Sequence, residues 1–204
     1  MHEFTPESIA PRDFYKIMTA TIAPRPIAWV STVDKDGKSN LAPFSFFNAV
    51  CSDPPLLMVS IGKKPSGEIK DTRRNILSGR DFVIHIANLS QAQVLSRSAA
   101  TLAYGDSELA TDDLALETFM GCSIPRLAEC SVAYHCKFYD SHIIGPSEQA
   151  VLYAEVIQLY VDYDIVQVSD DRTVIDADRM KPLSRLGGAN YGALKECFSL
   201  NRPK

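Results

Sequence analysis

The sequence predicts a mainly β protein, an antiparallel barrel or sandwich with a few helices at its margins. At least five stretches show the period-two alternation or the short apolar run that is typical of strands. The connections between strands are short, which favours antiparallel neighbours, and strands do not alternate regularly with helices. No GxGxxG or GxxxxGKS/T motif follows a strand. These observations argue against a doubly wound nucleotide-binding sheet.

The N-terminal segment, residues 1–23, is expected to be an arm followed by a short helix. Pro11 suits the first turn of a helix, and Phe14, Ile17 and Met18 then fall on one face.

The first strand is expected over residues 27–33. Pro24 and Pro26 exclude helix before it and keep the chain extended. Residues 34–37 read DKDG, the chemistry of a hairpin turn whose glycine can adopt a positive φ. A partner strand is therefore expected over residues 39–48.

This partner strand contains Pro43, which lacks an amide hydrogen, so the strand should be an edge strand or be bulged there. A Pro-rich corner at residues 52–55 leads to a strand over 56–61, covered on both faces. Ser66 resembles the N-cap of a helix that ends at Gly79.

The second half continues the β pattern. We expect a strand over 81–87, a helix from Ser90 to Ser98, and an excursion with short turns over 101–129. Period-two strands resume after Cys130. The tail, residues 175–200, is expected to be a loop, a Gly-rich turn and one short element.

Length, composition and charge limit the function classes. A chain of 204 residues without repeats or linkers suits a single domain, 1–204. The net charge of -4 argues against nonspecific nucleic-acid binding. No apolar run approaches the roughly 18 residues of a membrane span, and the N-terminus lacks the apolar core of a secretory signal. Five cysteines without a CxxC pair predict reduced thiols in a cytoplasmic protein.

Residues 63–75 are the candidate anion site. Five basic and two acidic residues give this segment a charge of +3 in a chain of -4. It surrounds the expected helix start, whose amides and dipole favour an anion, and Ser66 and Thr72 add hydroxyl donors. A solvated helix with ordinary surface charges is the alternative.

Other polar positions are candidates for contact with a flat ligand. Ser45 and Asn48 lie among apolar residues and need partners if buried, which a flavin edge could provide through N5, O4 and N3–H. Arg185 and Tyr191 bracket a Gly pair, which is either a surface turn or a mobile cover over a planar ligand. The phenylalanines between residues 44 and 47 are better explained as core.

No metal site or nucleophile is expected from motifs. The spacing of His85, His135 and His142 matches no zinc pattern, so core or surface histidines are favoured. No GxSxG motif is present, and Cys51 has no evident base.

Five segments together resemble the flavin reductase-like family with an FMN-binding split barrel, particularly the reductase component of nitrilotriacetate-type two-component monooxygenases. They are residues 24–48, 53–61, 70–76, 81–86 and 181–191. The resemblance implies a six-stranded antiparallel Greek-key split barrel with flanking helices. It also implies a homodimer with flavin near the subunit interface, and NAD(P)H:flavin oxidoreduction with NADH or NADPH as a transient hydride donor to flavin N5.

The resemblance also implies a set of FMN-binding residues. The isoalloxazine and ribityl chain would be bordered by Asn40, Ala42, Pro43, Phe44, Ser45, Asn48, Ser60, Ile61 and Gly62. The phosphate would be held by Lys70, Thr72, Arg73 and Asn75, with Arg25, Ser31 and Thr32 as neighbours. A Gly-Asp-His-like segment of the family is replaced by YDSHIIGPSEQ at 139–149, so His142 receives no corresponding role.

Three functions fit these features. The favoured one is a flavin reductase that uses FMN as fixed cofactor or diffusible substrate and supplies a monooxygenase or other acceptor. The others are an FMN-dependent oxidase or reductase of another small molecule, as in pyridoxamine-phosphate-oxidase relatives, and a non-enzymatic electron-transfer module. Because the flavin carries the redox step, no catalytic acid–base pair is required.

Overall fold

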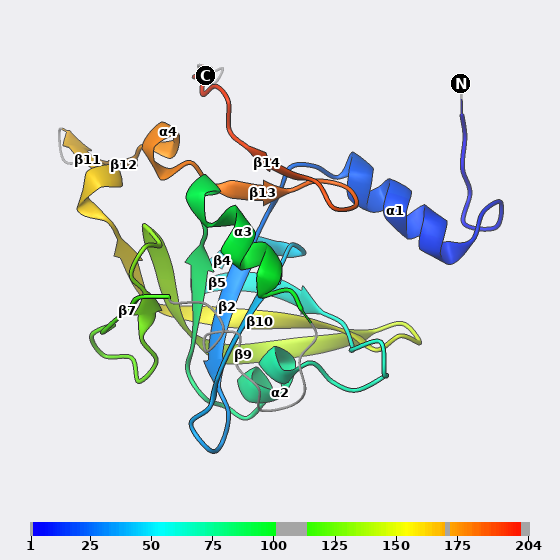
Figure 1. Cartoon of the computed structure of the whole chain (residues 1–204), viewed down its shortest axis with the longest axis horizontal. Coiled ribbons are helices and arrows are strands. Elements are labelled where there is room, and N and C mark those ends of the chain that lie inside the picture. Colours follow the sequence, from blue (N-terminus) through cyan, green and yellow to red (C-terminus); the bar gives the residue numbers. More distant parts are fainter. Residues whose placement is uncertain (1, 101–113, 170–171, 201–204) are drawn as a thin grey trace.

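The computed structural model describes residues 2–100, 114–169 and 172–200. Its centre is an antiparallel seven-stranded sheet with the order β3-β2-β6-β9-β10-β5-β4 (Figure 1). In chain order the strands are β2 Ala28–Val33, β3 Ser39–Phe44, β4 Phe47–Ser52, β5 Pro55–Ile61, β6 Phe82–Ile86, β9 Val132–Ile144 and β10 Gln149–Val161.

The sheet curls until its two edges meet at one corner. β3 and β4 are the edge strands, yet only Ser45 and Phe46 separate them in the chain. The amide of Ser60 on β5 donates to the Phe46 carbonyl at 2.8 Å, which fixes this corner against the sheet. The expected six-stranded barrel is therefore wrong in two respects. The main sheet has seven strands, and no ladder between β3 and β4 closes it within the described chain.

The expected single strand over 39–48 is also wrong. It breaks at the corner because Phe47 and the residues after it pair with β5, on the opposite side of the curled sheet. The expected edge position of Pro43 is confirmed, since β3 pairs only with β2 within the sheet.

The helices lie around the sheet. They are α1 Pro11–Thr21, α2 Asp71–Leu77, the 3-10 turn η1 Leu89–Gln91, α3 Ala92–Arg97, the 3-10 turn η3 Tyr163–Ile165 and α4 Ala177–Met180. Figure 1 shows α1 projecting from the body, with Pro in its first turn as expected.

Three small ladders complete the fold. β1 Arg25–Pro26, β13 Leu183–Arg185 and β14 Tyr191–Ala193 form one. The pairs β7 Leu116–Glu117 with β8 Arg126–Leu127, and β11 Val166–Ser169 with β12 Arg172–Ile175, form the others. The tail is thus more structured than expected.

Two helix starts differ from the expectation. α2 begins at Asp71, with Lys70 as N-cap, whereas Ser66 lies in a turn and donates to the Glu68 carboxylate. Asn88 caps η1, which leads into α3, and its side chain accepts from the Ser90 amide. The strand expected over 81–87 and the long strands after Cys130 are confirmed. Of the excursion expected over 101–129, residues 101–113 lie outside the described residues.

The described core contains three apolar clusters, two of which include residues of β3. One fills the inside of the curl and includes Val30, Val59 and Ile84. The other packs Trp29 and Leu41 against Leu95 of α3 and Leu183 of β13. This second cluster fixes α3 and the tail beside β3. No helix in the described ranges is long and apolar enough to cross a membrane.

Candidate functional site

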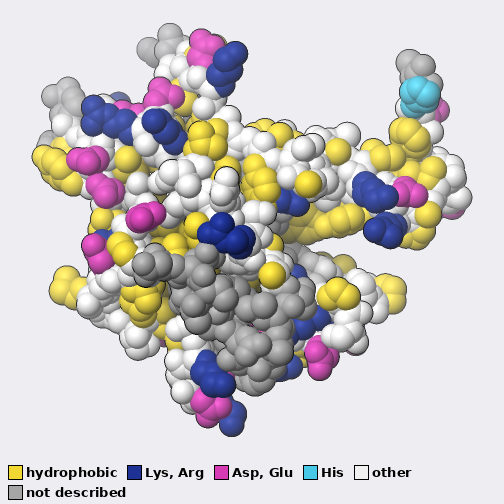
Figure 2. All heavy atoms as spheres, in the orientation of Figure 1, with side chains coloured by type: hydrophobic (Ala, Val, Ile, Leu, Met, Phe, Trp, Pro, Cys, Tyr) yellow, Lys and Arg dark blue, Asp and Glu magenta, His cyan; other side chains and the backbone are white. Residues whose placement is uncertain are grey.

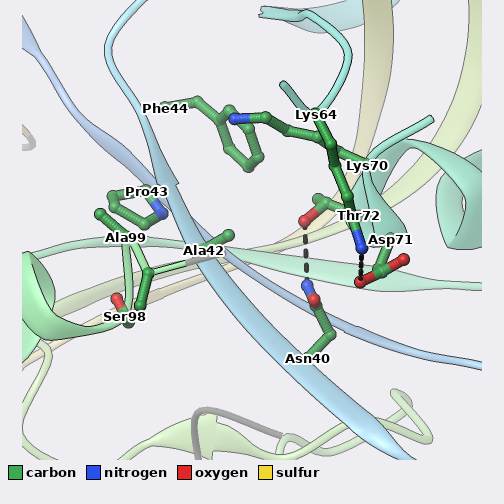
Figure 3. Close-up of a pocket in the computed structure, with 11 residues that line it drawn as sticks. Asn40, Ala42, Pro43, Phe44, Lys64, Lys70, Asp71, Thr72, Ser98 and Ala99 are labelled. Atoms are coloured by element: carbon green, nitrogen blue, oxygen red, sulfur yellow. Dashed lines mark hydrogen bonds and ion pairs between the residues drawn. The ribbon is translucent and has the colours of Figure 1, made fainter. Parts of the chain in front are cut away.

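Two adjoining pockets run along edge strand β3, and together they are termed the β3 groove. Their volumes are about 110 and 420 Å³. The smaller is lined by Asn40, Ala42, Pro43, Phe44, Lys64, Lys70, Asp71, Thr72, Ser98, Ala99 and Ala100 (Figure 3). The larger is lined by Tyr15, Lys16, Thr19, Arg25, Ile27, Pro43, Phe44, Ser45, Lys70, Leu95, Ala99, Arg185, Leu186, Gly188 and Tyr191.

The edge position of β3 supplies hydrogen-bonding groups to the groove. Alternate backbone groups of an edge strand point away from its neighbour, here β2, and in the described sheet no second strand pairs with β3. A planar ligand with donors and acceptors along one edge can pair with such a strand. Pro43 contributes no donor, so the available groups come from its neighbours.

Four buried polar residues form a network behind one wall of the groove. The Asn40 amide donates to Thr72 Oγ1 at 2.9 Å, and the Asn75 amide donates to Thr32 Oγ1 at 3.0 Å. Asn40 Nδ2 also lies 3.5 Å from Thr32 Oγ1, which links the two pairs. This polar network fixes α2 against β2 and β3. Asn40 and Thr72 also line the groove, whereas Thr32 and Asn75 do not.

Most basic side chains of the 63–75 segment already have acidic or carbonyl partners. Lys63 pairs with the Glu148 carboxylate, and Lys64 pairs with Asp71 at 2.9 Å. Arg73 is buried and donates through Nη1 to the backbone carbonyl of Glu148 at 3.0 Å, which ties α2 to the β9–β10 turn. Arg73 lines neither pocket of the groove.

Lys70 differs from its basic neighbours. Its ammonium group lies 5.4 Å from the centre of the Phe44 ring, and within the described residues it pairs with no carboxylate. Burial, and then the nearby Lys64 charge, lower the pKa of Lys70. Lys70 lines both pockets, so an anion here would gain a partly buried counter-charge.

Arg25 closes one end of the groove. Its guanidinium donates to the backbone carbonyls of Thr19 and Ile22 at the end of α1, and to that of Leu186 in the tail at 2.9 Å. Its Nε lies 3.5 Å from Ser45 Oγ. Arg25 thus joins three segments far apart in sequence, and most of its donors are used within the protein.

Residues 185–191 of the tail form a turn between β13 and β14 that lines the larger pocket of the groove. The Arg185 guanidinium stacks 4.4 Å from the centre of the Tyr191 ring and donates to the Gly188 carbonyl at 2.6 Å. Gly188 adopts a φ of 59°, and a Cβ on Gly187 would lie 2.7 Å from Cβ of Ala20. The Gly pair therefore permits the turn and its close approach to α1.

The remaining residues expected near flavin lie outside the groove. Ile61 is fully buried in the core, and a Cβ on Gly62 would meet the Gln149 side chain. Ser31 is buried, and its hydroxyl has no partner among the described residues. Asn48 and Ser60 line a separate apolar pocket of about 520 Å³ beneath α1.

Sequence reasoning missed several lining residues. Tyr15 and Lys16 come from α1, and Ser98 to Ala100 follow α3. Their sequence carries no signal of a site, because only the packing of α1 and α3 beside β3 brings them there. Lys64 was recognised as basic, but its position in the pocket wall depends on its ion pair with Asp71.

His85 is a core histidine whose ring nitrogens are both used. Nε2 accepts from the Leu127 amide at 3.0 Å, so the proton resides on Nδ1, which donates to the Trp29 carbonyl at 3.0 Å. Complete burial lowers the pKa of His85 to about 4. His142 packs edge-on against Tyr153, away from the groove. Neither histidine is placed for chemistry at the groove.

Comparisons of the sequence with known proteins agree on one family. The flavin reductase like domain matches residues 20–174. The uncharacterized protein YwrF of Bacillus subtilis (strain 168) is 35% identical over 208 residues, covering 100% of both chains. The FMN reductase (NADH) RutF of Bradyrhizobium diazoefficiens is 29% identical over 161 residues, covering 75% of this chain and 77% of that protein.

A solved structure supports the same family. Nitrilotriacetate monooxygenase component B from Bacillus cereus is 34% identical and superimposes with a TM-score of 0.89, covering 98% of each chain. The family match spans most of the curled sheet, including the edge strand and the basic segment that line the β3 groove. This chain therefore belongs to the flavin reductase like domain family.

Proposed function

We propose that the protein is an NAD(P)H:flavin oxidoreductase that binds FMN in the β3 groove. The observation that carries this proposal is Lys70, a partly buried cation in the groove without a carboxylate partner among the described residues. A phosphate beside Lys70 would supply the missing negative charge. Thr72 and Lys64 line the same pocket and would complete the phosphate site.

The isoalloxazine would lie along β3 in the larger pocket. There the outward-facing backbone groups of β3 beside the pocket would pair with its polar edge, and the rings of Phe44 and Tyr191 would lie nearby. The Arg185–Tyr191 cover and α1 would limit access of water. FMN, when bound, supplies hydride acceptance and electron release, so the chain's task is to bind and orient.

Three further parts of the site would act indirectly in this scheme, by holding the walls of the groove in place. Arg25 would hold α1, the tail and the corner at Ser45 in place, and the polar network would hold α2, which carries Thr72. Arg73 would anchor α2 to the β9–β10 turn.

We further propose that the protein is a single-domain homodimer. The apolar pocket beneath α1 is lined by Met18, Ile22, Phe46 and Met58, and Met18 and Ile22 are exposed. Figure 2 shows hydrophobic side chains along the hollow under the projecting α1. Burying this surface against a second copy would stabilise the dimer. Light scattering should give twice the chain mass of 22.5 kDa, and a monomer that binds FMN tightly would contradict it.

The acceptor of reduced flavin and the cellular compartment are also part of this proposal. The similarity to a monooxygenase component supports a monooxygenase, or another acceptor, as consumer of reduced flavin. The five cysteines are all free, which fits a reducing compartment, and we place the protein in the cytoplasm.

Anaerobic reduction tests the reaction. FMN-loaded protein should lose its visible flavin absorption on addition of NADH or NADPH, and the NADH reductase RutF makes NADH the first donor to try. Dithionite serves as the positive control. If dithionite reduces the flavin and neither nicotinamide does, the protein is an oxidase with another donor or an electron-transfer module.

A further inference from the structure

We propose that Asp81, Cys122 and His135 bind a divalent metal ion of the zinc class at a site separate from the β3 groove. None of the three lines either groove pocket. Asp81 precedes β6, His135 lies in β9 opposite Val83, and Cys122 lies between β7 and β8. One potential ligand atom from each lies within 4.8 Å of the others. These residues are termed the donor cluster.

The spacing of the donor cluster suits a tetrahedral ion after a small contraction. Zinc bonds of about 2.0 to 2.3 Å to oxygen, nitrogen and sulfur place neighbouring ligand atoms roughly 3.2 to 3.7 Å apart. Nε2 of His135 and Oδ2 of Asp81 are already 2.9 Å apart. These two atoms would separate slightly, and the Cys122 sulfur, which lies within 4.8 Å of them, would move closer through a side-chain rotation.

His135 is available as a ligand in a way that His85 is not. The His135 residue is 2% exposed, and its Nδ1 is buried without a hydrogen-bond partner among the described residues. Asp81 alone therefore sets its tautomer, and the proton can occupy Nδ1 when an ion takes Nε2. In His85, by contrast, protein groups occupy both nitrogens.

The sulfur of Cys122 lies beside one backbone amide. The Ile124 amide donates to Cys122 Sγ at 3.4 Å, a contact that favours the thiolate. Burial outweighs this contact, and together with the Asp81 charge it raises the pKa of the Cys122 thiol. A metal ion binds the thiolate, so binding at Cys122 would release the thiol proton as the metal–sulfur bond forms.

The donor types select the metal. A thiolate, an imidazole and a carboxylate suit zinc and similar first-row ions, whereas magnesium and calcium prefer oxygen ligands throughout. One thiolate and one carboxylate also neutralise a divalent ion. Asp81 and Cys122 are only partly buried, so water can fill a fourth position.

Cobalt(II) is the probe for this site, because a cobalt–thiolate bond gives a near-ultraviolet charge-transfer absorption. Full-length protein freed of metal by chelation should bind about one Co²⁺ per chain with this absorption, and Zn²⁺ should abolish it. Cys122→Ser should lose the absorption while remaining folded by circular dichroism, since the change is nearly isosteric. Asp81→Asn and His135→Gln should weaken Co²⁺ binding at least tenfold, as about 10- to 100-fold losses are usual around metal sites.

Cys51→Ser is the matched control, because Cys51 is also a free thiol but is exposed on β4. It should bind Co²⁺ like the unchanged protein. The proposal is overturned if the unchanged protein shows no thiolate absorption, or if that absorption survives Cys122→Ser. These readouts do not depend on flavin, so their failure would leave the proposed reductase activity untouched.

Discussion

Lys70 and the polar network stand close together on one wall of the β3 groove, yet their hydrogen-bonding states differ. Asn40, Thr72, Thr32 and Asn75 satisfy one another across β2, β3 and α2. Lys70, one residue before α2, lies near an aromatic ring and another lysine, and its ammonium group pairs with no carboxylate among the described residues. Groups that hydrogen-bond one another within the protein stabilise the wall, whereas a cation without an anionic partner is stabilised by a bound anion. The family resemblance assigned both kinds of residue to the phosphate.

Replacing Lys70 should have the largest effect, and the effect should be on FMN binding. Lys70→Ala should weaken FMN binding about 10- to 100-fold, because a charge-assisted contact contributes roughly 1.5 to 3 kcal/mol. Riboflavin, which lacks the phosphate, should bind unchanged. Lys63→Ala is the matched control, since Lys63 pairs with Glu148 outside both groove pockets. Fluorescence titration measures both ligands, and equal weakening of both would move the phosphate away from Lys70.

Breaking the polar network should instead reduce the stability of the fold. Asn75→Ala leaves buried Thr32 with a weaker set of partners and should lower the free energy of unfolding by about 1 to 3 kcal/mol. Urea unfolding measures this loss, and FMN and riboflavin should be affected alike. Gln93→Ala, at an exposed position of α3, should change stability by less than about 0.5 kcal/mol. A selective loss of FMN in the Asn75 variant would show direct phosphate contact.

FMN binding at Lys70 should also depend on pH. Burial lowers the pKa of Lys70, and phosphate favours the charged lysine, so binding above that pKa requires proton uptake. FMN affinity should therefore fall as pH rises through the lowered pKa, by up to about tenfold per pH unit. Riboflavin affinity corrects for titration of the flavin ring. A Lys70→Met variant should lose the FMN-specific decline, and its persistence would assign the decline to another group.

Local patterns in the sequence predicted most strands but not how the groove is assembled. Pro43 indicated an edge strand because its missing amide hydrogen is a local property. The break at Ser45 was not predictable from alternation, which continues through the corner while the pairing partner changes from β2 to β5. Partner choice is a tertiary property. The tertiary fold likewise determines that the Asn75 side chain donates to Thr32 and that Arg25 donates to three backbone carbonyls.

The smallest effect should come from changes in the proposed Arg185–Tyr191 cover, which belongs neither to the polar network nor to the surroundings of Lys70. Arg185 and Tyr191 interact with each other at an exposed turn, and such a pair contributes roughly 0.5 to 1 kcal/mol, or about two- to fivefold. Arg185→Ala should therefore reduce turnover with NADH by about two- to fivefold, because the cover no longer limits access of water, and should change FMN affinity less. Tyr191→Phe keeps the aromatic face and should behave like the unchanged protein, whereas Tyr191→Ala should match Arg185→Ala. Steady-state rates and FMN titration separate the two readouts. A loss of FMN affinity as large as that of Lys70→Ala would make Arg185 a ligand of the phosphate and not part of a cover.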